Sequence, residues 1–323
     1  MKNTEKKYLC FADFEFTCGY FINKFDSEIL SAGMVICDES YNIAEQFYHT
    51  SKPNHFPKLT KQCKKLTKLT QQEISSSPDS NDVMGSILKL LQKYNIDNIY
   101  VWGNFDKTGL ISDVKQHQKF GKECSNIQRT GKKIYDIQQK LINIMELPEP
   151  VNIQELASAF DYTPLNGTFH NALNDAFALY VIYKSVYTKD LSQNEKLTEI
   201  RNNRVEKIKQ RHLEIEKRQK ETALSMPLTD KEKLYYCTMQ EESTETKSFL
   251  YLRSKFVSSL NNNPNKNVFL FLYMNTTERY KVIPKEKYNK TLQKLSEKVI
   301  EFERDNFSEI LLNECKKSDT VKV

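Results

Sequence analysis

The sequence predicts an α/β domain over residues 1–190, a charged helical linker over residues 191–228 and a small α+β domain over residues 229–323. Three observations indicate this order. Strand-like and helix-like segments alternate up to about residue 190, which is typical of an α/β fold. The composition then changes to densely mixed lysine and glutamate, and a strongly apolar strand with a nearby partner returns at residue 268.

Three strands open the predicted α/β domain. Residues 8–16 are rich in aromatic and apolar side chains, and residues 29–37 form a second apolar run. Residues 41–49 alternate between apolar and polar side chains, as a half-buried strand does. The lysine-rich stretch between Pro53 and Pro78 is expected to be irregular, with short helical pieces.

A helix and a short strand come next. Residues 75–78 predict a loop that leads into the helix, whose apolar side chains fall on one stripe at helical spacing. The stripe consists of Val83, Ile87, Leu90 and Leu91. Residues 99–102 then predict a short buried strand.

Four helical segments complete the α/β domain. One begins near Asp106, and another covers residues 134–145. Asn152 has the residue type of an N-cap for the third. A turn that contains Gly167 precedes the last helix, over residues 172–187, in which apolar side chains repeat at helical spacing.

The rest of the chain predicts one long helix and a small α+β region. From residue 190 to about residue 224, only a narrow apolar stripe runs between charged residues, which indicates a long polar helix. Residues 268–274 predict a buried strand, residues 275–278 a turn and residues 279–283 a partner strand. Pro284 then opens a predicted helix with an apolar side made of Tyr288, Leu292, Leu295 and Val299.

The composition permits several functions and excludes a few. The 323 residues include 48 lysines and arginines against 42 aspartates and glutamates, and the formal net charge of +6 permits nucleic-acid binding without requiring it. No apolar run reaches the roughly 18 residues of a membrane span, and acidic residues interrupt the N-terminal apolar stretch, so we expect no membrane association and no signal peptide. The 7 cysteines form no Cys-x-x-Cys pair, which predicts reduced thiols in a cytoplasmic protein and argues against a zinc site.

Two acids on the first predicted strand are the first candidates for a functional site. Asp13 and Glu15 are two positions apart, so both side chains project from the same face of the strand. Acids on an otherwise apolar strand are costly to bury unless a cation neutralises them. By themselves, the two acids fit either a catalytic site or the solvent side of an edge strand.

Three more polar residues stand at the edges of predicted elements. Asp106 lies where a buried strand gives way to a helix, an edge at which open α/β sheets bind ligands, although an N-cap role also explains it. His170 falls in the turn before the last helix of the domain, and small alanines around Asp175 leave room for its carboxylate. Each piece alone also fits an ordinary solvated residue, but their joint occurrence favours one site.

These residues resemble the three motifs of the DEDDh 3′–5′ exonucleases. The motifs are Asp13-Phe14-Glu15, Asp106, and His170 followed by Asp175. The resemblance is closer still to the branch of the enhanced-RNA-interference and histone mRNA 3′-end exonucleases, through the stretches at residues 13–18, 63–71 and 102–107. It covers about residues 8–187 and implies an RNase H-like fold, in which a mixed sheet is flanked by helices.

Three positions depart from the family's pattern. Lys68 stands where a glycine is often found, and Phe169 stands where a basic residue commonly precedes the histidine. Asn174 replaces the first member of an Asp-Asp pair, whereas the ligand position, Asp175, is kept. All five catalytic residue types are present, so the resemblance does not indicate an inactive scaffold.

The resemblance implies two Mg²⁺ ions, for which Mn²⁺ can substitute. Phosphodiester hydrolysis must stabilise charge on both the attacking and the leaving oxygen, and hard cations take carboxylate ligands. By the resemblance, Asp13 bridges both ions, Glu15 and Asp175 complete the site that binds the attacking water, and Asp106 supports the second ion. His170, with an ordinary pKa of about 6.5, is expected to accept the proton of the water.

Substrate contacts are expected from Glu15, Phe16, Thr17, Phe105 and His170. By the resemblance, Phe16 and Thr17 meet the terminal nucleotide through backbone and side chain. Phe105 is either a stacking surface, worth roughly 1–3 kcal/mol per base, or part of the core. The lysines before Thr70 either follow phosphates or form a solvated loop; they are Lys58, Lys61, Lys64, Lys65 and Lys68.

We therefore predict a metal-dependent exonuclease that removes 5′-mononucleotides from RNA 3′ ends, with the RNA preference implied by the branch resemblance. A DNA-directed or proofreading-type 3′–5′ exonuclease of the same fold is the nearest alternative, and a non-catalytic RNA-binding protein is another. The C-terminal region carries no motif. Basic and aromatic residues interleave there at residues 251–256 and 279–281, which fits either an accessory RNA surface or ordinary packing. The polar helix over residues 191–224 is a candidate for self-association.

Overall fold

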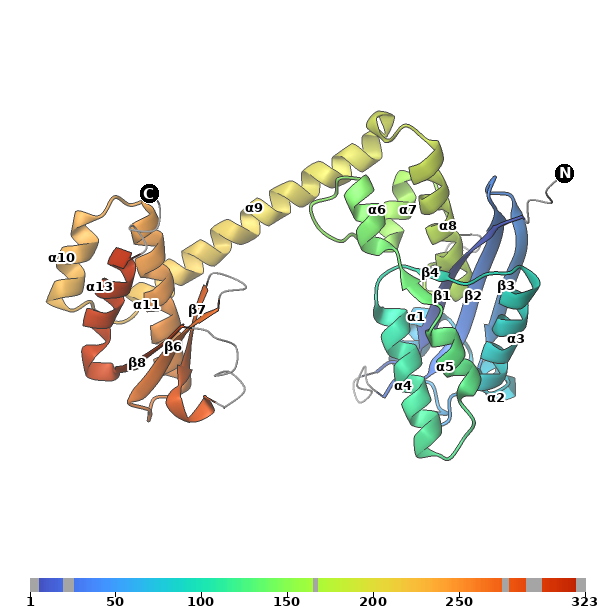
Figure 1. Ribbon diagram of the computed structural model, residues 1–323, viewed down its shortest axis with the longest axis horizontal. Helices are drawn as coiled ribbons and strands as arrows, with labels where there is room; N and C mark the ends of the chain where they lie inside the picture. The colour runs from blue at the N-terminus through green and yellow to red at the C-terminus, as the bar shows by residue number, and fades with distance from the viewer. Residues whose placement is uncertain (1–5, 20–25, 165–167, 275–278, 289–297, 318–323) are drawn as a thin grey trace. The chain divides into compact units, whose positions relative to one another are not determined.

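The computed structural model describes residues 6–19, 26–164, 168–274, 279–288 and 298–317 (Figure 1). The chain divides into two units, Met1–Glu206 and Lys207–Val323, each with its own sheet. None of the helices in the described ranges is long and apolar enough to cross a membrane. The predicted turns at Gly167 and at residues 275–278 lie outside the described residues.

The first unit is built on a mixed sheet with the strand order β3-β2-β1-β4-β5. Its strands are β1 (Tyr8–Phe16), β2 (Ile29–Asp38), β3 (Ile43–Thr50), β4 (Ile99–Val101) and β5 (Ile134–Asp136). The first three strands pair antiparallel, whereas β4 and β5 run parallel to β1. This is the predicted RNase H-like architecture, and the predicted bounds of the first strand agree to the residue.

Helices cover both faces of this sheet because side chains alternate along β1. Phe11 joins an apolar cluster with α6 (Gln138–Ile144), α7 (Ile153–Ala159) and α8 (Ala172–Thr188). Phe14 and Phe16 point to the other face and join a cluster with α3 (Ser80–Lys93), α4 (Phe105–Lys119) and α5 (Ser125–Gly131). Asp13 and Glu15 continue the row of Phe11, so they face α8.

Side-chain caps fix several helix starts. Asn152 accepts a hydrogen bond from the backbone N–H of Glu155, as its residue type predicts. In the lysine-rich stretch, Thr60 caps α1 (Lys61–Thr67) and Thr70 caps α2 (Gln71–Ser76). Because α2 runs through Ser76, the loop predicted over residues 75–78 is shorter than expected. The apolar stripe predicted on the following helix is buried at all four positions.

The helix predicted over residues 134–145 is wrong at its start. Ile134 pairs with Ile99 of β4, so the segment begins as the last strand of the sheet. The Asp136 carboxylate then accepts from the backbone N–H of Gln138 at 2.9 Å, where α6 begins. Strand and helix follow each other so closely that the sequence pattern merges them.

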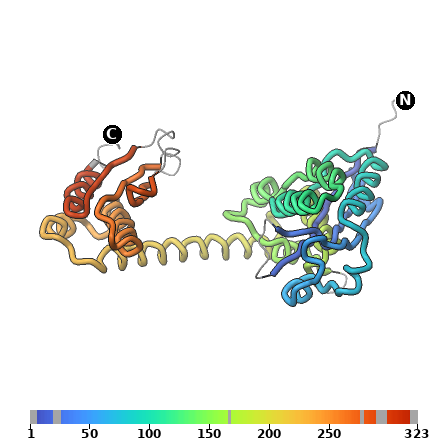
Figure 2. The backbone as a smooth tube through the Cα atoms, turned by 90° about the horizontal axis from the view of Figure 1, so that it is seen from below, coloured from blue at the N-terminus to red at the C-terminus, as the bar shows by residue number. Residues whose placement is uncertain are grey.

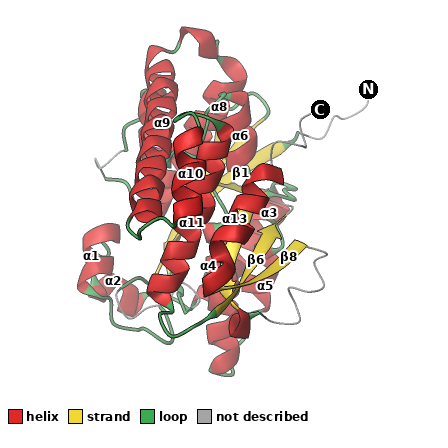
Figure 3. Cartoon of the chain, turned by 90° about the vertical axis from the view of Figure 1, so that its left-hand side faces the viewer, coloured by secondary structure: helices red, strands yellow, loops and turns green. Residues whose placement is uncertain are grey.

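The second unit is an α+β unit with the strand order β7-β6-β8. Its strands are β6 (Val268–Met274), β7 (Arg279–Pro284) and β8 (Lys298–Glu303), and the helices α10 (Asp230–Thr238), α11 (Thr244–Asn262) and α13 (Phe307–Lys317) accompany them (Figure 3). The apolar cluster between helices and sheet includes Phe256, Phe271 and Phe302.

The described residues bear on two expectations for the second unit. Lys285–Lys287 form a 3-10 turn after Pro284, and Val299 lies in β8, where it pairs with Leu272, so the helix predicted from Pro284 does not reach Val299. Leu292 and Leu295 lie outside the described residues. Of the two interpretations of residues 251–256, ordinary packing holds for Arg253, because its side chain is fully buried against Glu232.

The predicted polar helix is α9 (Glu195–Leu224), which Figure 2 shows as one uninterrupted helix. It starts later than expected because a 3-10 turn, Leu191–Gln193, precedes it. Leu197 and Ile200 are buried in the first unit, and the carbonyl of Ala223 accepts a hydrogen bond from Arg253 in the second. Between these two packed ends, the apolar residues Val205 and Ile215 of the narrow stripe are exposed.

Candidate active site

A missing side chain on β2 lets α8 lie directly on the sheet beside the two acids of β1. Asp13 pairs with Gly33, so a side chain on Gly33 would project from the same face as the Asp13 carboxylate. A Cβ atom on Gly33 would lie 2.1 Å from Leu173 N and 2.2 Å from the carbonyl carbon of Ala172. Glycine at this position therefore brings the first turn of α8 next to Asp13.

The start of α8 holds a histidine and an acid together. Asn171 caps the helix by accepting from the N–H groups of Leu173 and Asn174, both at 3.2 Å. His170 has a positive φ of 61°, and its N–H donates to Asp175 Oδ2 at 3.0 Å. As a result, one ligand atom each of Glu15, His170 and Asp175 lies within 4.8 Å of the other two.

Asp106 reaches the same region from the other side of β1. Its Oδ1 atom accepts from the backbone N–H of Phe14 at 3.2 Å, beyond the point where β4 ends. The N-cap position of α4 belongs to Asn104, so the N-cap role considered for Asp106 is wrong. The Asp106 carboxylate therefore lies against the backbone between Asp13 and Glu15.

Asp136 shapes the turn that leads to Asp106, and sequence reasoning missed it. Its Oδ1 atom accepts from the N–H of Gly103 and from that of Gln138, each at 2.9 Å. Gly103 has a φ of 91°, which glycine adopts without strain. The signal was an acid at the end of a strand, and the helix predicted over the same residues concealed it.

Burial raises the pKa of all four carboxyl groups. The pKa of Asp13 lies well above its ordinary value because of burial and then the nearby charges of Asp106, Glu15 and Asp175. Burial, with repulsion from Asp175 and Asp106, raises the pKa of Glu15 to about 8. Burial raises the pKa of Asp106 to about 7 and that of Asp175 to about 6. Such a cluster holds protons near neutral pH unless cations replace them.

The residues present fit a divalent cation. Asp175 Oδ1 is buried and has no hydrogen-bond partner among the described residues, a costly state for a carboxylate oxygen. Glu15 and His170 lie beside it, and after burial the charges of Asp106, Glu15 and Asp175 raise the pKa of Asp13 in the same site. Hard divalent cations prefer such oxygen ligands. Several acids with one unpartnered oxygen therefore form a plausible site for metal ions.

The expected substrate residues fall into two groups. The Phe16 ring is only 4% exposed, and a Cβ on Gly109 would lie 2.3 Å from it, so the ring is enclosed by α4. Thr17 is also buried, and its Oγ1 atom accepts from the N–H of Glu28 at 2.9 Å. Because both side chains are buried, we expect Phe16 and Thr17 to contact a substrate through their backbone. Phe105 is 60% exposed, so the core role considered for it is wrong.

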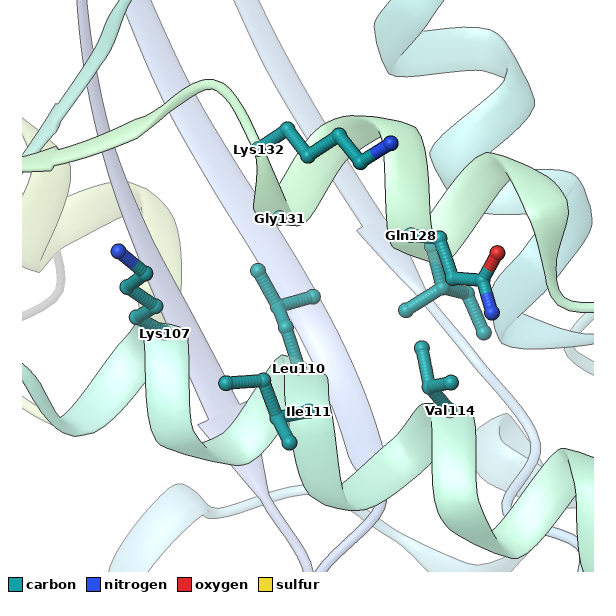
Figure 4. Close-up of a pocket in the computed structure, with 8 residues that line it drawn as sticks. Lys107, Leu110, Ile111, Val114, Gln128, Gly131 and Lys132 are labelled. Atoms are coloured by element: carbon teal, nitrogen blue, oxygen red, sulfur yellow. The ribbon is translucent and has the colours of Figure 1, made fainter.

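A cavity of about 490 Å³ lies between α4 and α5, away from the acids (Figure 4). Leu110, Ile111 and Val114 line it on α4, and Lys107 and Lys132 stand at its sides. Its lining contains no acid and no histidine. The cavity therefore offers no carboxylate and no imidazole to bind a metal ion or to transfer a proton.

Comparisons with known proteins identify the family of the first unit. The chain matches the RNase_T exonuclease family over residues 10–183. It is 31% identical over 184 residues to the probable 3′-5′ exonuclease KapD of Bacillus subtilis, an alignment that covers 55% of this chain and 83% of KapD.

Two solved structures are also similar. One is the nuclease domain of 3′hExo, a DEDDh family member, bound to rAMP, with 18% identity, a TM-score of 0.48, and coverage of 57% of this chain and 94% of that one. The other is the 3′-exonuclease of a histone mRNA stem-loop recognition structure, with 17% identity, a TM-score of 0.49, and coverage of 59% and 65%. By its family match and its relative in Bacillus subtilis, the chain belongs to the RNase_T exonuclease family, as a 3′–5′ exonuclease of the DEDDh type.

Proposed function

We propose that this chain is a 3′–5′ exoribonuclease that removes 5′-mononucleotides from RNA 3′ ends with two divalent cations, Mg²⁺ in the first place. The observation that carries the proposal is the convergence of Glu15, His170 and Asp175 within 4.8 Å, beside two further acids. The RNA preference rests on the motif resemblance at residues 13–18, 63–71 and 102–107. Residues 1–190 carry the reaction in this proposal, and residues 229–323 form an accessory domain.

The acids would hold the cations, and His170 would take up a proton. Asp13, Glu15, Asp106 and Asp175 are the proposed ligands; when bound, the two ions stabilise charge on the attacking and leaving oxygens. The backbone N–H of His170 donates to Asp175 and fixes the backbone of this residue, and Gln154 Nε2 lies 3.3 Å from His170 Nε2, where it positions the ring. Burial lowers the pKa of His170, which keeps its imidazole neutral and able to accept the proton of the attacking water near neutral pH.

A degradation assay tests the proposal. Purified full-length protein is incubated with 5′-labelled single-stranded RNA, or with DNA of the same sequence, in Mg²⁺ or in EDTA. We expect a ladder of products shortened one nucleotide at a time from the 3′ end, formed faster on RNA and abolished by EDTA. Wild-type protein that releases no mononucleotides contradicts the proposal, and faster degradation of the DNA overturns the RNA preference.

Asp13→Ala is the matched control in this assay. The substitution removes a proposed ligand and also removes a buried carboxyl group that Asp106, Glu15 and Asp175 repel, so we expect the variant to fold and to lose cleavage. Cleavage by Asp13→Ala at the wild-type rate would remove the acids of β1 from the mechanism.

A further inference from the structure

Two cysteines beside the candidate active site have no part in the proposed function. Cys18 follows the end of β1, three positions after Glu15, and Cys63 lies in the first turn of α1. Cys63 is 1% exposed, whereas Cys18 is only partly buried. Both pack in one apolar cluster with Leu30, Leu59, Leu69 and Ile74. The pair therefore combines a cysteine that is partly open to solvent with one that is enclosed.

Thr60 holds the backbones of the two cysteines together. Its Oγ1 atom donates to the carbonyl oxygen of Cys18 at 2.6 Å and accepts from the backbone N–H of Cys63 at 3.0 Å. A Cβ atom on Gly19 would lie 2.7 Å from Thr60 Cγ2, so glycine lets the chain after Cys18 come this close. One side chain thus sets the spacing between the two cysteines.

The thiol groups of Cys18 and Cys63 are in hydrogen-bond contact. The Cys63 thiol also lies 3.9 Å from the carbonyl oxygen of Phe16, just before Cys18 in the chain. An S–S bond is about 2.0 Å long, so two thiols that already touch need only a small movement of the backbone to form it. The pair is therefore placed to form a disulfide.

The same contact makes the two thiols unequal in reactivity. The hydrogen bond from Cys63 lowers the pKa of Cys18 to about 7, whereas this hydrogen bond and then burial raise the pKa of Cys63 above its ordinary value. The thiolate is the form that attacks an oxidant, and redox-sensitive cysteines combine a low pKa with exposure and a neighbouring second cysteine. Cys18 therefore suits the role of nucleophile, and Cys63 that of the resolving thiol.

We propose that a peroxide oxidises Cys18 and Cys63 to a reversible disulfide, which slows cleavage at the neighbouring active site. The Cys18 sulfur attacks one peroxide oxygen: an S–O bond forms, the O–O bond breaks, and the released oxygen leaves as water with the thiol proton of Cys18. The Cys63 sulfur then attacks the sulfenic acid on Cys18: the S–S bond forms, the S–O bond breaks, and a second water leaves with the thiol proton of Cys63. The sulfurs lose two electrons, which the peroxide gains, and a dithiol reductant reverses the oxidation.

The disulfide reaches the active site through the end of β1. The backbone that it would pull toward α1 runs from Phe16 to Cys18, directly after Glu15. Burial and the charges of Asp175 and Asp106 raise the pKa of Glu15, and so does the charge of Cys18, which therefore lies within electrostatic range of this acid. A misplacement of about 1 Å in a catalytic group costs on the order of 100-fold in rate. This effect on activity rests on the proposed function, whereas the disulfide itself does not.

Peptide mapping tests the disulfide without any measurement of activity. Reduced full-length protein is treated with stoichiometric hydrogen peroxide in EDTA, and the remaining thiols are blocked with iodoacetamide. Chymotrypsin cuts after Phe16 and so separates Cys18 from Cys10. We expect a cross-link between Cys18 and Cys63 that dithiothreitol removes. No such cross-link, or a cross-link of Cys18 to the exposed Cys237 in its place, would overturn the proposal.

Cys63→Ser tests which thiol reacts first. Without the resolving thiol, the sulfenic acid on Cys18 should persist and be trapped by dimedone. Cys237→Ser is the matched control, because it removes an exposed cysteine of the second unit and should still form the cross-link. Dimedone bound to another cysteine, with none on Cys18, would contradict the assignment of Cys18 as the nucleophile.

The rate of RNA cleavage gives the last readout, after the peroxide is removed and Mg²⁺ is added. We expect oxidised wild-type protein and Cys237→Ser to lose about ten- to hundred-fold in kcat/KM and to recover it with dithiothreitol. Cys18→Ser should have the same kcat/KM before and after peroxide. Cross-linked wild-type protein with an unchanged rate would overturn the effect on cleavage. Reduced wild-type protein that releases no mononucleotides would instead refute the proposed function, and the peptide map would still decide whether the disulfide forms.

Discussion

Gly33→Ala should move His170 and Asp175 away from the acids of β1 by adding one methyl group between β2 and α8. The added Cβ would lie 2.1 Å from Leu173 N and 2.4 Å from Ala172 O, whereas real Cβ atoms essentially never approach closer than 3.0 Å. Both atoms belong to the backbone of α8, so the start of this helix has to move by about 1 Å to relieve the overpacking. His170 and Asp175 would move with α8, while the acids of β1 stay in place.

The size of the effect follows from this displacement. A misplacement of about 1 Å in a catalytic group costs on the order of 100-fold in rate. Overpacking of a buried site costs about 1–3 kcal/mol of the free energy of unfolding, and each kcal/mol lowers Tm by about 2–4 °C in a domain of this size. We therefore expect Gly33→Ala to lose about 100-fold in kcat and about 2–12 °C in Tm.

Single-turnover cleavage of labelled RNA and a thermal melt measure both quantities. Gly131→Ala is the matched control, because its Cβ would meet only Leu110 Cβ at 3.9 Å, an ordinary contact. The control should keep the kcat of wild-type protein. If Gly33→Ala also kept both kcat and Tm, α8 would not be seated on β2 in the way that positions His170 and Asp175.

Three further predictions concern pH and the supports of the site. Burial raises the pKa of Glu15 to about 8, so without metal the free energy of unfolding falls as pH rises from the ordinary pKa of a glutamate to about 8. Mg²⁺ should therefore raise Tm more at pH 8 than at pH 6. An equal rise at both pH values would count against a metal site at these acids. Burial alone would lower the pKa of His117, but hydrogen bonds to Asp113 and Asp79 raise it to about 10, so its contribution is complete below about pH 6.5 and is lost as pH rises through 10. His117→Gln should lower Tm at pH 7 by about 6–20 °C and flatten the decline of Tm between pH 7 and pH 10; an unchanged decline would refute the ion-pair assignment. Asp136→Ala should reduce kcat about ten-fold by freeing two backbone N–H groups, whereas Asp136→Asn, which keeps an acceptor oxygen, should restore it; two variants of equal activity would contradict this role.

The sequence was sufficient where the structure follows from local patterns. The bounds of β1 and β6 were predicted to the residue, because β6 is an apolar run of seven residues and β1 is rich in aromatic and apolar side chains apart from its two acids. The cap of α7 followed from the residue type of Asn152. The candidate site residues were predicted from their places at element edges and from motifs, and the structure brings Glu15, His170 and Asp175 together.

Other features depend on contacts between distant segments. β5 has three residues, too few to show an alternating pattern, and it is a strand only because it pairs with β4. Gly33 matters because of a helix far along the chain, a relation that no local pattern contains. Arg253 looked like a surface residue, but Glu232 and three backbone carbonyls make its burial possible. These outcomes are set by packing, not by residue type.

A calorimetric titration with Mn²⁺ tests the central claim most directly, namely that the acids of β1, α4 and α8 form one site for two divalent ions. The titration compares wild-type protein with Asp13→Asn at pH 8, with 5′-AMP present to supply a phosphate. The account predicts two bound ions per chain in wild-type protein and fewer in the variant, because Asp13 is the proposed ligand of both. No binding by wild-type protein, or the same two ions bound by Asp13→Asn, would contradict it.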